Sequence, residues 1–152
     1  MNNSGAWEEV HNCVVAEYIW IDGSGISLRS KCKTLLIDEV KSLADIPEWN
    51  YDGSSCEQAT TDNSEIIMKP VAYFRDPFRK GNHILVMTET FKWTDGKYSE
   101  LEPANTNFRA HAKTIFDACL DEEPWFGIEQ EYTLVGTNTK FTNWPLGWPH
   151  DG

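Results

Sequence analysis

The N-terminal part of the chain alternates apolar and polar side chains at the two-residue period of β-strands. Residues 14–21 and 26–36 both show this period, and the turn-forming sequence Asp-Gly-Ser-Gly lies between them. This order predicts a β-hairpin, because such residues favour tight turns between paired strands. Two more strands are predicted over 64–72 and 83–91, and Asp95-Gly96 indicates the turn of a later hairpin.

Beyond residue 101 the pattern changes to the period of an α-helix. The stretch 102–107 contains a proline followed by residues that commonly cap helix N-termini. Apolar residues then recur at helical spacing through Leu120: Phe108, Ala112, Ile115, Phe116 and Cys119. We therefore predict a helix that ends before Pro124 and whose apolar stripe packs into a core.

A further aromatic and β-branched run, residues 125–134, contains two carboxylates. In a strand, Glu129 and Glu131 would lie on one face, roughly 7 Å apart at a rise of about 3.3 Å per residue. Each carboxylate could then bind one divalent cation, because hard cations prefer oxygen ligands. The alternative is a strand whose polar face is simply solvated, and the pattern alone favours that alternative.

An ordered loop is predicted over 47–55, where large aromatic residues are mixed with turn formers and small hydroxyls. Loops of this kind often carry function. Alternatively, Asp52-Gly53 forms an ordinary turn while Trp49 and Tyr51 fill the core. Without other information the sequence favours this simpler interpretation.

The composition narrows the class of partner. The formal net charge of -11 comes from 24 acidic and 13 basic residues, which argues against nucleic acid, because phosphates are bound by clustered Lys and Arg. No apolar run is long enough for a membrane span or a secretion signal, so we expect a soluble, cytoplasmic chain without a membrane partner. Four scattered cysteines suggest neither a zinc site nor a disulfide framework: Cys13, Cys32, Cys56 and Cys119.

Several specific segments follow one another in a recognisable order between about residues 16 and 149. They are Tyr-Ile-Trp-Ile-Asp-Gly at 18–23, Leu-Arg-Ser-Lys at 28–31, Trp-Asn-Tyr-Asp-Gly-Ser-Ser at 49–55, Asp-Pro-Phe-Arg at 76–79 with Gly-Asn at 81–82, Glu-Pro-Trp-Phe-Gly-Ile-Glu-Gln-Glu-Tyr-Thr-Leu at 123–134, and Trp-Pro-Leu-Gly-Trp-Pro at 144–149. Together they closely resemble the eukaryotic type of glutamine synthetase, the enzyme that makes glutamine from glutamate, ammonia and ATP.

The resemblance implies an α+β fold with a β-grasp N-terminal domain. An N-terminal arm at 1–13 would precede the β-grasp domain at 14–101. Residues 102–152 would form the truncated start, a helix plus a strand, of the catalytic domain. Members of the family assemble into homo-oligomeric rings. By resemblance, Asp52 reaches an adjacent subunit's site, where it helps to bind ammonium and to remove its proton, because ammonia attacks only as the neutral amine.

The resemblance also assigns the two carboxylates of 125–134. Glu129 would hold the divalent ion next to the ATP phosphates, and Glu131 would hold the ion next to glutamate. Mg²⁺ or Mn²⁺ would offset the charge that builds up while a phosphoryl group leaves ATP. The implied reaction is ATP-dependent ligation of ammonia to L-glutamate through γ-glutamyl phosphate, which gives L-glutamine.

The C-terminal sequence departs from the family. Family members continue past Trp-Pro-Leu-Gly-Trp-Pro into further metal-binding and substrate-binding residues, whereas this sequence reads His-Asp-Gly at 150–152. We expect this chain alone to be inactive and to bind metal weakly, because two carboxylates leave water in most of the positions around a divalent ion. The alternatives are a non-catalytic subunit that joins or modulates rings of full-length synthetase and a gene remnant.

The two ends of the sequence are also expected to differ in stability. Burying a large side chain stabilises by roughly 1.5 to 3 kcal/mol, whereas ordering each residue costs about 1 to 2 kcal/mol of backbone entropy. For a lone helix and strand, the stabilisation from burial does not offset the entropy cost of ordering the chain. We therefore expect 14–101 to fold as a protected unit and 123–152 to be mobile, to self-associate or to order only on a partner.

Overall fold

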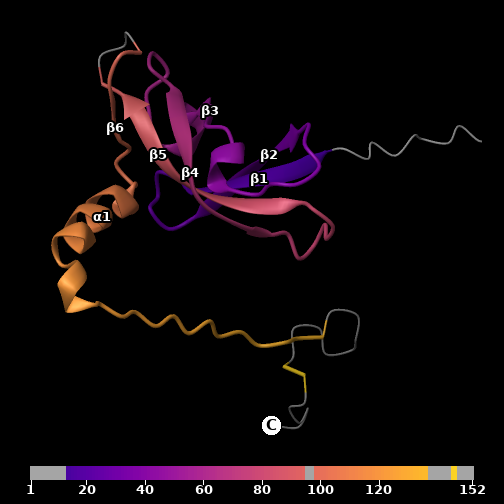
Figure 1. The fold of residues 1–152 in the computed structure, drawn as a ribbon. Coiled ribbons are helices and arrows are strands. Elements are labelled where there is room, and N and C mark those ends of the chain that lie inside the picture. Colours follow the sequence, from indigo (N-terminus) through magenta and orange to yellow (C-terminus); the bar gives the residue numbers. More distant parts are fainter. Residues whose placement is uncertain (1–12, 95–97, 137–144, 147–152) are drawn as a thin grey trace, which may run out of the picture. The chain divides into compact units, whose positions relative to one another are not determined.

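The computed structural model describes residues 13–94, 98–136 and 145–146 (Figure 1). The fold is α+β, as predicted. Its strands and helix are β1 (Val14–Ile21), β2 (Leu28–Leu35), β3 (Trp49–Asp52), β4 (Glu65–Arg75), β5 (Ile84–Trp93), β6 (Leu101–Pro103) and α1 (Phe108–Ala118). Short 3-10 helices are η1 (Leu43–Asp45), η2 (Gly53–Cys56) and η3 (Leu120–Glu122). The chain divides into two compact units, one ending at Ala118 and the other beginning at Cys119.

The strands form one sheet in the order β2-β1-β5-β4-β3, with β6 paired to the C-terminal end of β5. β1 and β2 form the predicted antiparallel hairpin, in which Tyr18 lies opposite Lys31. β1 also pairs with β5, but in parallel, with Ala16 opposite Ile84. A central parallel pair between two antiparallel hairpins is consistent with the β-grasp architecture. The strands predicted over 64–72 and 83–91 are confirmed as β4 and β5.

The core lies on one face of the sheet, where the two-residue period of the sequence is realised as burial. β1 alternates buried and half-buried residues along its whole length. Tyr18 is fully buried, and its hydroxyl donates to the Pro47 carbonyl at 2.7 Å. Trp20 stacks on Tyr51, with ring centroids 4.3 Å apart. The core members are Val14, Ala16, Tyr18, Trp20, Leu35, Val40, Ile46, Tyr51, Cys56, Ile66, Met68, Ile84 and Val86.

The sheet curls, so that its two outermost strands are joined by side chains. β2 and β3 are the ends of the strand order, yet the Lys31 ammonium on β2 donates to the Asn50 carbonyl on β3 at 2.9 Å. The same ammonium lies 3.6 Å from the centroid of the Trp49 ring, a cation–π contact. Desolvation, followed by the neighbouring charge of Lys33, lowers the pKa of Lys31. Trp49 and Tyr51 therefore serve the core and the closure of the sheet.

The predicted helix forms, and its start is fixed by a side chain. The Asn107 side-chain oxygen Oδ1 accepts from the Ala110 amide at 3.1 Å, which is the expected N-cap bond. The Asn107 side-chain amide donates to the Thr90 carbonyl on β5 at 2.9 Å. The helix start is therefore anchored to the sheet.

The predicted burial of the helix stripe is not observed. None of the residues of α1 is buried, and Phe108 is 57% exposed. The helix also ends at Ala118, before Cys119 and Leu120, to which the predicted stripe extended. An amphipathic pattern states which face can be buried, but burial needs a second surface. On this face Ile115 and Phe116 remain 51% and 37% exposed.

The predicted strand over 125–134 is wrong for this structure. The described residues from 123 to 134 adopt no regular secondary structure, and Trp125 and Ile128 are 92% and 95% exposed. Next to them, Val135 forms an isolated antiparallel bridge with Pro145. A strand is stabilised by ladder hydrogen bonds to a neighbour, and no described strand pairs with this segment.

Other predictions fall outside the described residues. These are the N-terminal arm up to residue 12, the turn at Asp95-Gly96 and most of the aromatic segment 144–149. No helix within 13–94 and 98–136 is long and apolar enough to cross a membrane.

Candidate functional site

Asp52 stands where β3 passes into the 3-10 helix η2, and its side chain caps that helix. One carboxylate oxygen accepts from the Ser54 amide at 2.9 Å and from the Ser54 hydroxyl at 2.6 Å. The Ser55 hydroxyl donates to the Asp52 carbonyl at 3.0 Å. The Asp-Gly-Ser-Ser sequence thus builds its own support for the carboxylate.

Gly53 is required here because of close packing. A Cβ atom at this position would clash with the Ile66 side chain and would approach Ala59 to 3.1 Å. The Gly53 amide donates to the Ser64 carbonyl at 2.6 Å. The backbone next to Asp52 is therefore pressed against β4 and cannot carry a larger residue without displacement.

The Asp52 carboxyl is exposed and negatively charged at neutral pH. Its hydrogen bond from the Ser54 hydroxyl, followed by the bond from the Ser54 amide, holds its pKa below the usual range. Hydrogen bonds to the charged form favour that form. A fixed, exposed carboxylate of this kind is suited to binding a cation.

A cavity of about 400 Å³ lies beside Asp52. It is lined by Trp20, Arg29, Ser30, Tyr51, Asp52, Ser55 and Cys56. Its size falls within the range of small-molecule sites. The indole nitrogen of Trp20 is buried and has no hydrogen-bond partner among the residues that the structure describes.

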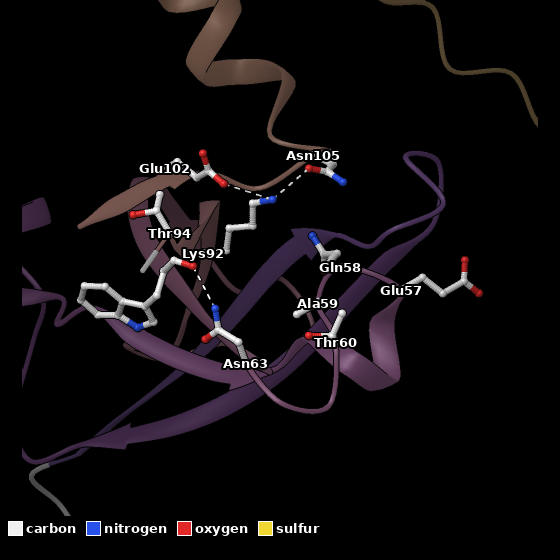
Figure 2. Close-up of a pocket in the computed structure, with 10 residues that line it drawn as sticks. Glu57, Gln58, Ala59, Thr60, Asn63, Lys92, Thr94, Glu102 and Asn105 are labelled. Atoms are coloured by element: carbon white, nitrogen blue, oxygen red, sulfur yellow. Dashed lines mark hydrogen bonds and ion pairs between the residues drawn. The ribbon is translucent and has the colours of Figure 1, made fainter. Parts of the chain in front are cut away.

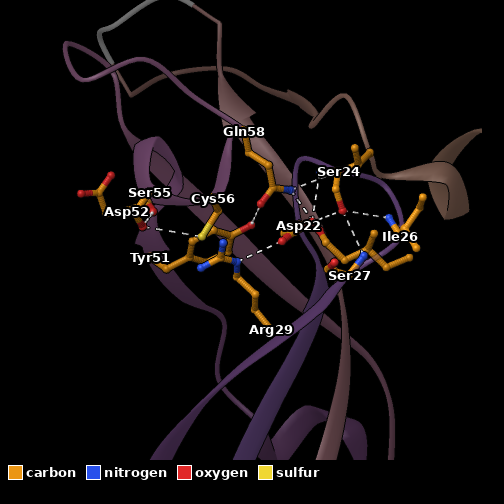
Figure 3. A network of polar contacts seen from close by, with 12 residues as sticks. Asp22, Ser24, Ile26, Ser27, Arg29, Tyr51, Asp52, Ser55, Cys56 and Gln58 are labelled. Atoms are coloured by element: carbon orange, nitrogen blue, oxygen red, sulfur yellow. Dashed lines mark hydrogen bonds and ion pairs between the residues drawn. The ribbon is translucent and has the colours of Figure 1, made fainter.

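The Arg29 side chain in this cavity is held by Asp22. Its Nε donates to the Asp22 carboxylate at 3.1 Å. The other Asp22 oxygen accepts from the Ser24 hydroxyl at 2.5 Å and from the Ser24 amide at 3.0 Å. The hydrogen bonds from Ser24, and then that from Arg29, lower the pKa of Asp22. The hairpin turn therefore fixes the Arg29 cation in the wall of the cavity that Asp52 also lines (Figure 3).

A second cavity, of about 460 Å³, opens between β5, β6 and the loop after η2 (Figure 2). Lys92 lies at its edge, 3.1 Å from the Glu102 carboxylate, and donates to the Asn105 side-chain carbonyl at 3.4 Å. The Asn63 side chain donates to the Trp93 carbonyl at 2.9 Å. The charge of Lys92 is offset within the wall of this cavity, so we assign it no ligand.

Glu129 and Glu131 lie in the exposed segment without regular secondary structure. The described residues contain no group of three or more His, Cys, Asp or Glu side chains that could hold a metal ion. The two glutamates belong to the unit that begins at Cys119, whereas Asp52 belongs to the unit that ends at Ala118.

Sequence reasoning missed three residues around the site: Asp22, Arg29 and Gln58. The Asp-x-Ser sequence at 22–24 is a recognisable signal, because aspartate commonly bonds the backbone two residues on. The pairing of Arg29 with Asp22 follows once the hairpin is known. Gln58 lies in a loop and has no such signal, since its burial depends on segments far away in the sequence.

The comparison with curated proteins identifies relatives across most of the chain. This chain is 51% identical over 141 residues to glutamine synthetase cytosolic isozyme 1-5 of Arabidopsis thaliana. The matched region covers 91% of this chain and 37% of that protein. The chain is 53% identical over 138 residues to the chloroplastic glutamine synthetase of Brassica napus, covering 90% of this chain and 30% of the relative. Glutamine synthetase root isozyme 3 of Zea mays is 51% identical over 141 residues.

These relatives are longer than the region they share with this chain. The chain spans 37% of the length of the Arabidopsis and maize proteins and 30% of the Brassica protein. No protein-family model matches the sequence. The matched region is the N-terminal part of the relatives. The chain is therefore a homologue of the eukaryotic glutamine synthetases over the N-terminal portion of those proteins.

Proposed function

We propose that this chain supplies the N-terminal portion of a site for ATP-dependent ligation of ammonia to L-glutamate, giving L-glutamine by way of γ-glutamyl phosphate. The observation that carries the proposal is the identity of about half of the residues over nine-tenths of the chain to proteins named glutamine synthetase. In this proposal 14–101 is the β-grasp domain, 1–13 its N-terminal arm, and 102–152 the start of a catalytic domain.

Asp52 is proposed to bind the ammonium ion. A carboxylate that is exposed, fixed by Ser54 and kept deprotonated attracts a small cation. The same lowered pKa makes Asp52 a weak acceptor for the proton that ammonium must lose. The fixed carboxylate and its low pKa therefore support ammonium binding more strongly than proton removal. A proton that Asp52 did accept would pass on to water or another base.

Glu129 and Glu131 are proposed to contribute carboxylate ligands for Mg²⁺ or Mn²⁺, with ATP and glutamate as the substrates. The oxygen chemistry of the two side chains fits such ions. The arrangement in this chain does not, because both residues are exposed on a segment without regular structure and the described residues provide no group of three ligands. No catalytic step is therefore derived through a metal, and the 152-residue polypeptide alone is expected to be inactive.

A second candidate function is that of a non-catalytic subunit that joins rings of a full-length synthetase. The observation in its favour is that the hydrogen bonds to the Asp52 carboxylate come from Ser54, which lies in the same unit ending at Ala118. In a mixed homologous ring, this carboxylate would act in a neighbouring subunit's site. We place this assembly in the cytoplasm, which is where the printed name puts the Arabidopsis relative, whereas the Brassica relative is named for the chloroplast.

Glutamine formation by the purified polypeptide, given glutamate, ammonium, ATP and Mg²⁺, tests the proposed function. We expect the polypeptide alone to form no glutamine. We also expect it to co-purify with a full-length synthetase.

In the mixed assembly, Asp52→Asn should raise the KM for ammonium and leave the KM for glutamate unchanged. Glu48→Gln, an exposed carboxylate change on the same unit, is the matched control. Glutamine formation by the polypeptide alone contradicts the expected inactivity. An unchanged KM for ammonium contradicts the role of Asp52.

A further inference from the structure

Gln58 is a buried polar residue that joins three separate segments. It is only 5% exposed. Its side-chain oxygen accepts from the Tyr51 hydroxyl at 2.6 Å, and its side-chain nitrogen donates to the Ile21 carbonyl at 3.2 Å and to the Thr106 hydroxyl oxygen at 3.1 Å. Burial raises the pKa of Tyr51, so the phenol keeps its proton and acts as the donor. That fixes the orientation of the Gln58 amide (Figure 3).

The same residue holds the chain on both sides of Asp52. The Gln58 side chain binds Tyr51, the residue before Asp52. The Gln58 backbone amide donates to the carbonyl of Gly53, the residue after Asp52, at 2.9 Å. A movement of Gln58 must therefore move the backbone that carries the Asp52 carboxylate.

Thr106 lies in the segment that leads into α1, and its neighbours are bound to β5. The Ala104 amide donates to the Thr90 carbonyl at 2.9 Å, and the Asn107 side chain donates to the same carbonyl at 2.9 Å. Thr106 itself is half-buried. Its hydroxyl thus offers Gln58 a fixed acceptor just before the helix.

We infer that Gln58 is a positioning residue that holds the Asp52 segment in register with the segment 104–107. Displacement of the helix start is transmitted through Thr106 and Gln58 to the Asp52 carboxylate. In a longer synthetase this would link the ammonium site to the entry into the following domain. The importance of that link rests on the proposed function, but the coupling itself is a property of the described residues.

Hydrogen exchange on the full 152-residue chain tests the coupling without any activity assay. Thr106→Val removes the hydroxyl and keeps nearly the same side-chain shape. Thr106→Ser, a separate variant, keeps the hydroxyl. Because a net hydrogen bond corresponds to roughly a 2- to 10-fold change in an equilibrium, we expect amides of Gly53, Ser54 and Gln58 to exchange about 2- to 10-fold faster in Thr106→Val. Thr106→Ser should return them to the wild-type rate.

Thr88→Val is the matched control. It makes the same change of side chain but removes a different hydrogen bond, from the Thr88 hydroxyl to the Ile19 carbonyl on β1, at 2.8 Å. It should leave the three amides within about twofold of wild type. Unchanged exchange in Thr106→Val overturns the inference, as does failure of Thr106→Ser to rescue it. Equal acceleration across β1 and β2 also overturns it, because that indicates general destabilisation. The role of Asp52 in ammonium binding is decided separately by the Asp52→Asn variant.

Discussion

Strand β1 and the segment 125–134 are both rich in aromatic and β-branched residues, but they have different structures. In β1 every second residue is buried, and the strand has a partner on each side, β2 and β5. In 125–134 the large apolar side chains of both faces are exposed, and the described residues provide no paired strand. The period of a sequence therefore specifies which face a strand can bury, and neighbouring strands decide whether the strand forms.

The largest expected effect is loss of a core ring on β1. Tyr18→Ala should lower the free energy of unfolding by about 3–5 kcal/mol, the usual range for removing a buried aromatic ring. Tyr132→Ala, in the exposed segment, should change it by less than about 0.5 kcal/mol. Urea unfolding followed by tryptophan fluorescence measures both. Equal effects of the two substitutions would remove the difference between the regions.

Two glycines give a second contrast. Gly53→Ala forces a methyl group against Ile66, so we expect a loss of about 1–3 kcal/mol from overpacking. Gly127→Ala meets nothing within 4 Å and should leave the unfolding free energy unchanged. Urea midpoints of the two variants measure this contrast. A neutral Gly53→Ala would show that the Asp52 segment is not pressed against β4.

A third prediction concerns the Asn107 cap, which joins the start of α1 to the sheet. Asn107→Ala removes both the N-cap bond and the bond to Thr90, and we expect α1 to lose about 0.5–2 kcal/mol. Asn105→Ala, an exposed neighbour, is the control. Hydrogen exchange of the α1 amides reports the change. If α1 exchanges equally fast in the wild type and in Asn107→Ala, then the cap does not stabilise the helix.

The smallest expected effect is the pH dependence that Asp76 gives to the sheet unit. Its hydrogen bond from the Arg79 side chain, followed by those from the Arg79 and Phe78 amides, holds its pKa below the usual range. Its contribution is therefore present above the unfolded value near pH 4 and is lost as the pH falls through the lower folded pKa. The stability gap between wild type and Asp76→Asn should narrow below about pH 4 in urea unfolding. A constant gap would contradict this role of Asp76.

The sequence predicted those features that depend on local pattern. The hairpin of β1 and β2, the strands β4 and β5 and the helix all follow from spacing and turn residues. The parallel pairing of β1 with β5 could not be read in this way, because it joins residues more than sixty positions apart. The prediction at 125–134 failed for the same physical reason, since it required a partner strand that a local pattern does not specify.

Site prediction followed the same division. The residue pattern over 47–55 favoured an ordinary turn at Asp52-Gly53, and only the resemblance to glutamine synthetases pointed to Asp52. The support from Ser54 is local and could have been expected from the Asp-Gly-Ser sequence. The bonds of Gln58 to Ile21 and Thr106 connect distant segments, so they appear only in the folded sheet.

The central claim is that the unit ending at Ala118, which contains the whole sheet, is stable by itself, whereas 125–134 needs a partner strand. Hydrogen exchange on dilute, monomeric 152-residue chain tests it most directly. The amides of β1 and β2 should be strongly protected, and those of 125–135 should exchange at nearly the rate of a free peptide. Equal protection of 125–135 and of the 14–35 hairpin would contradict the claim.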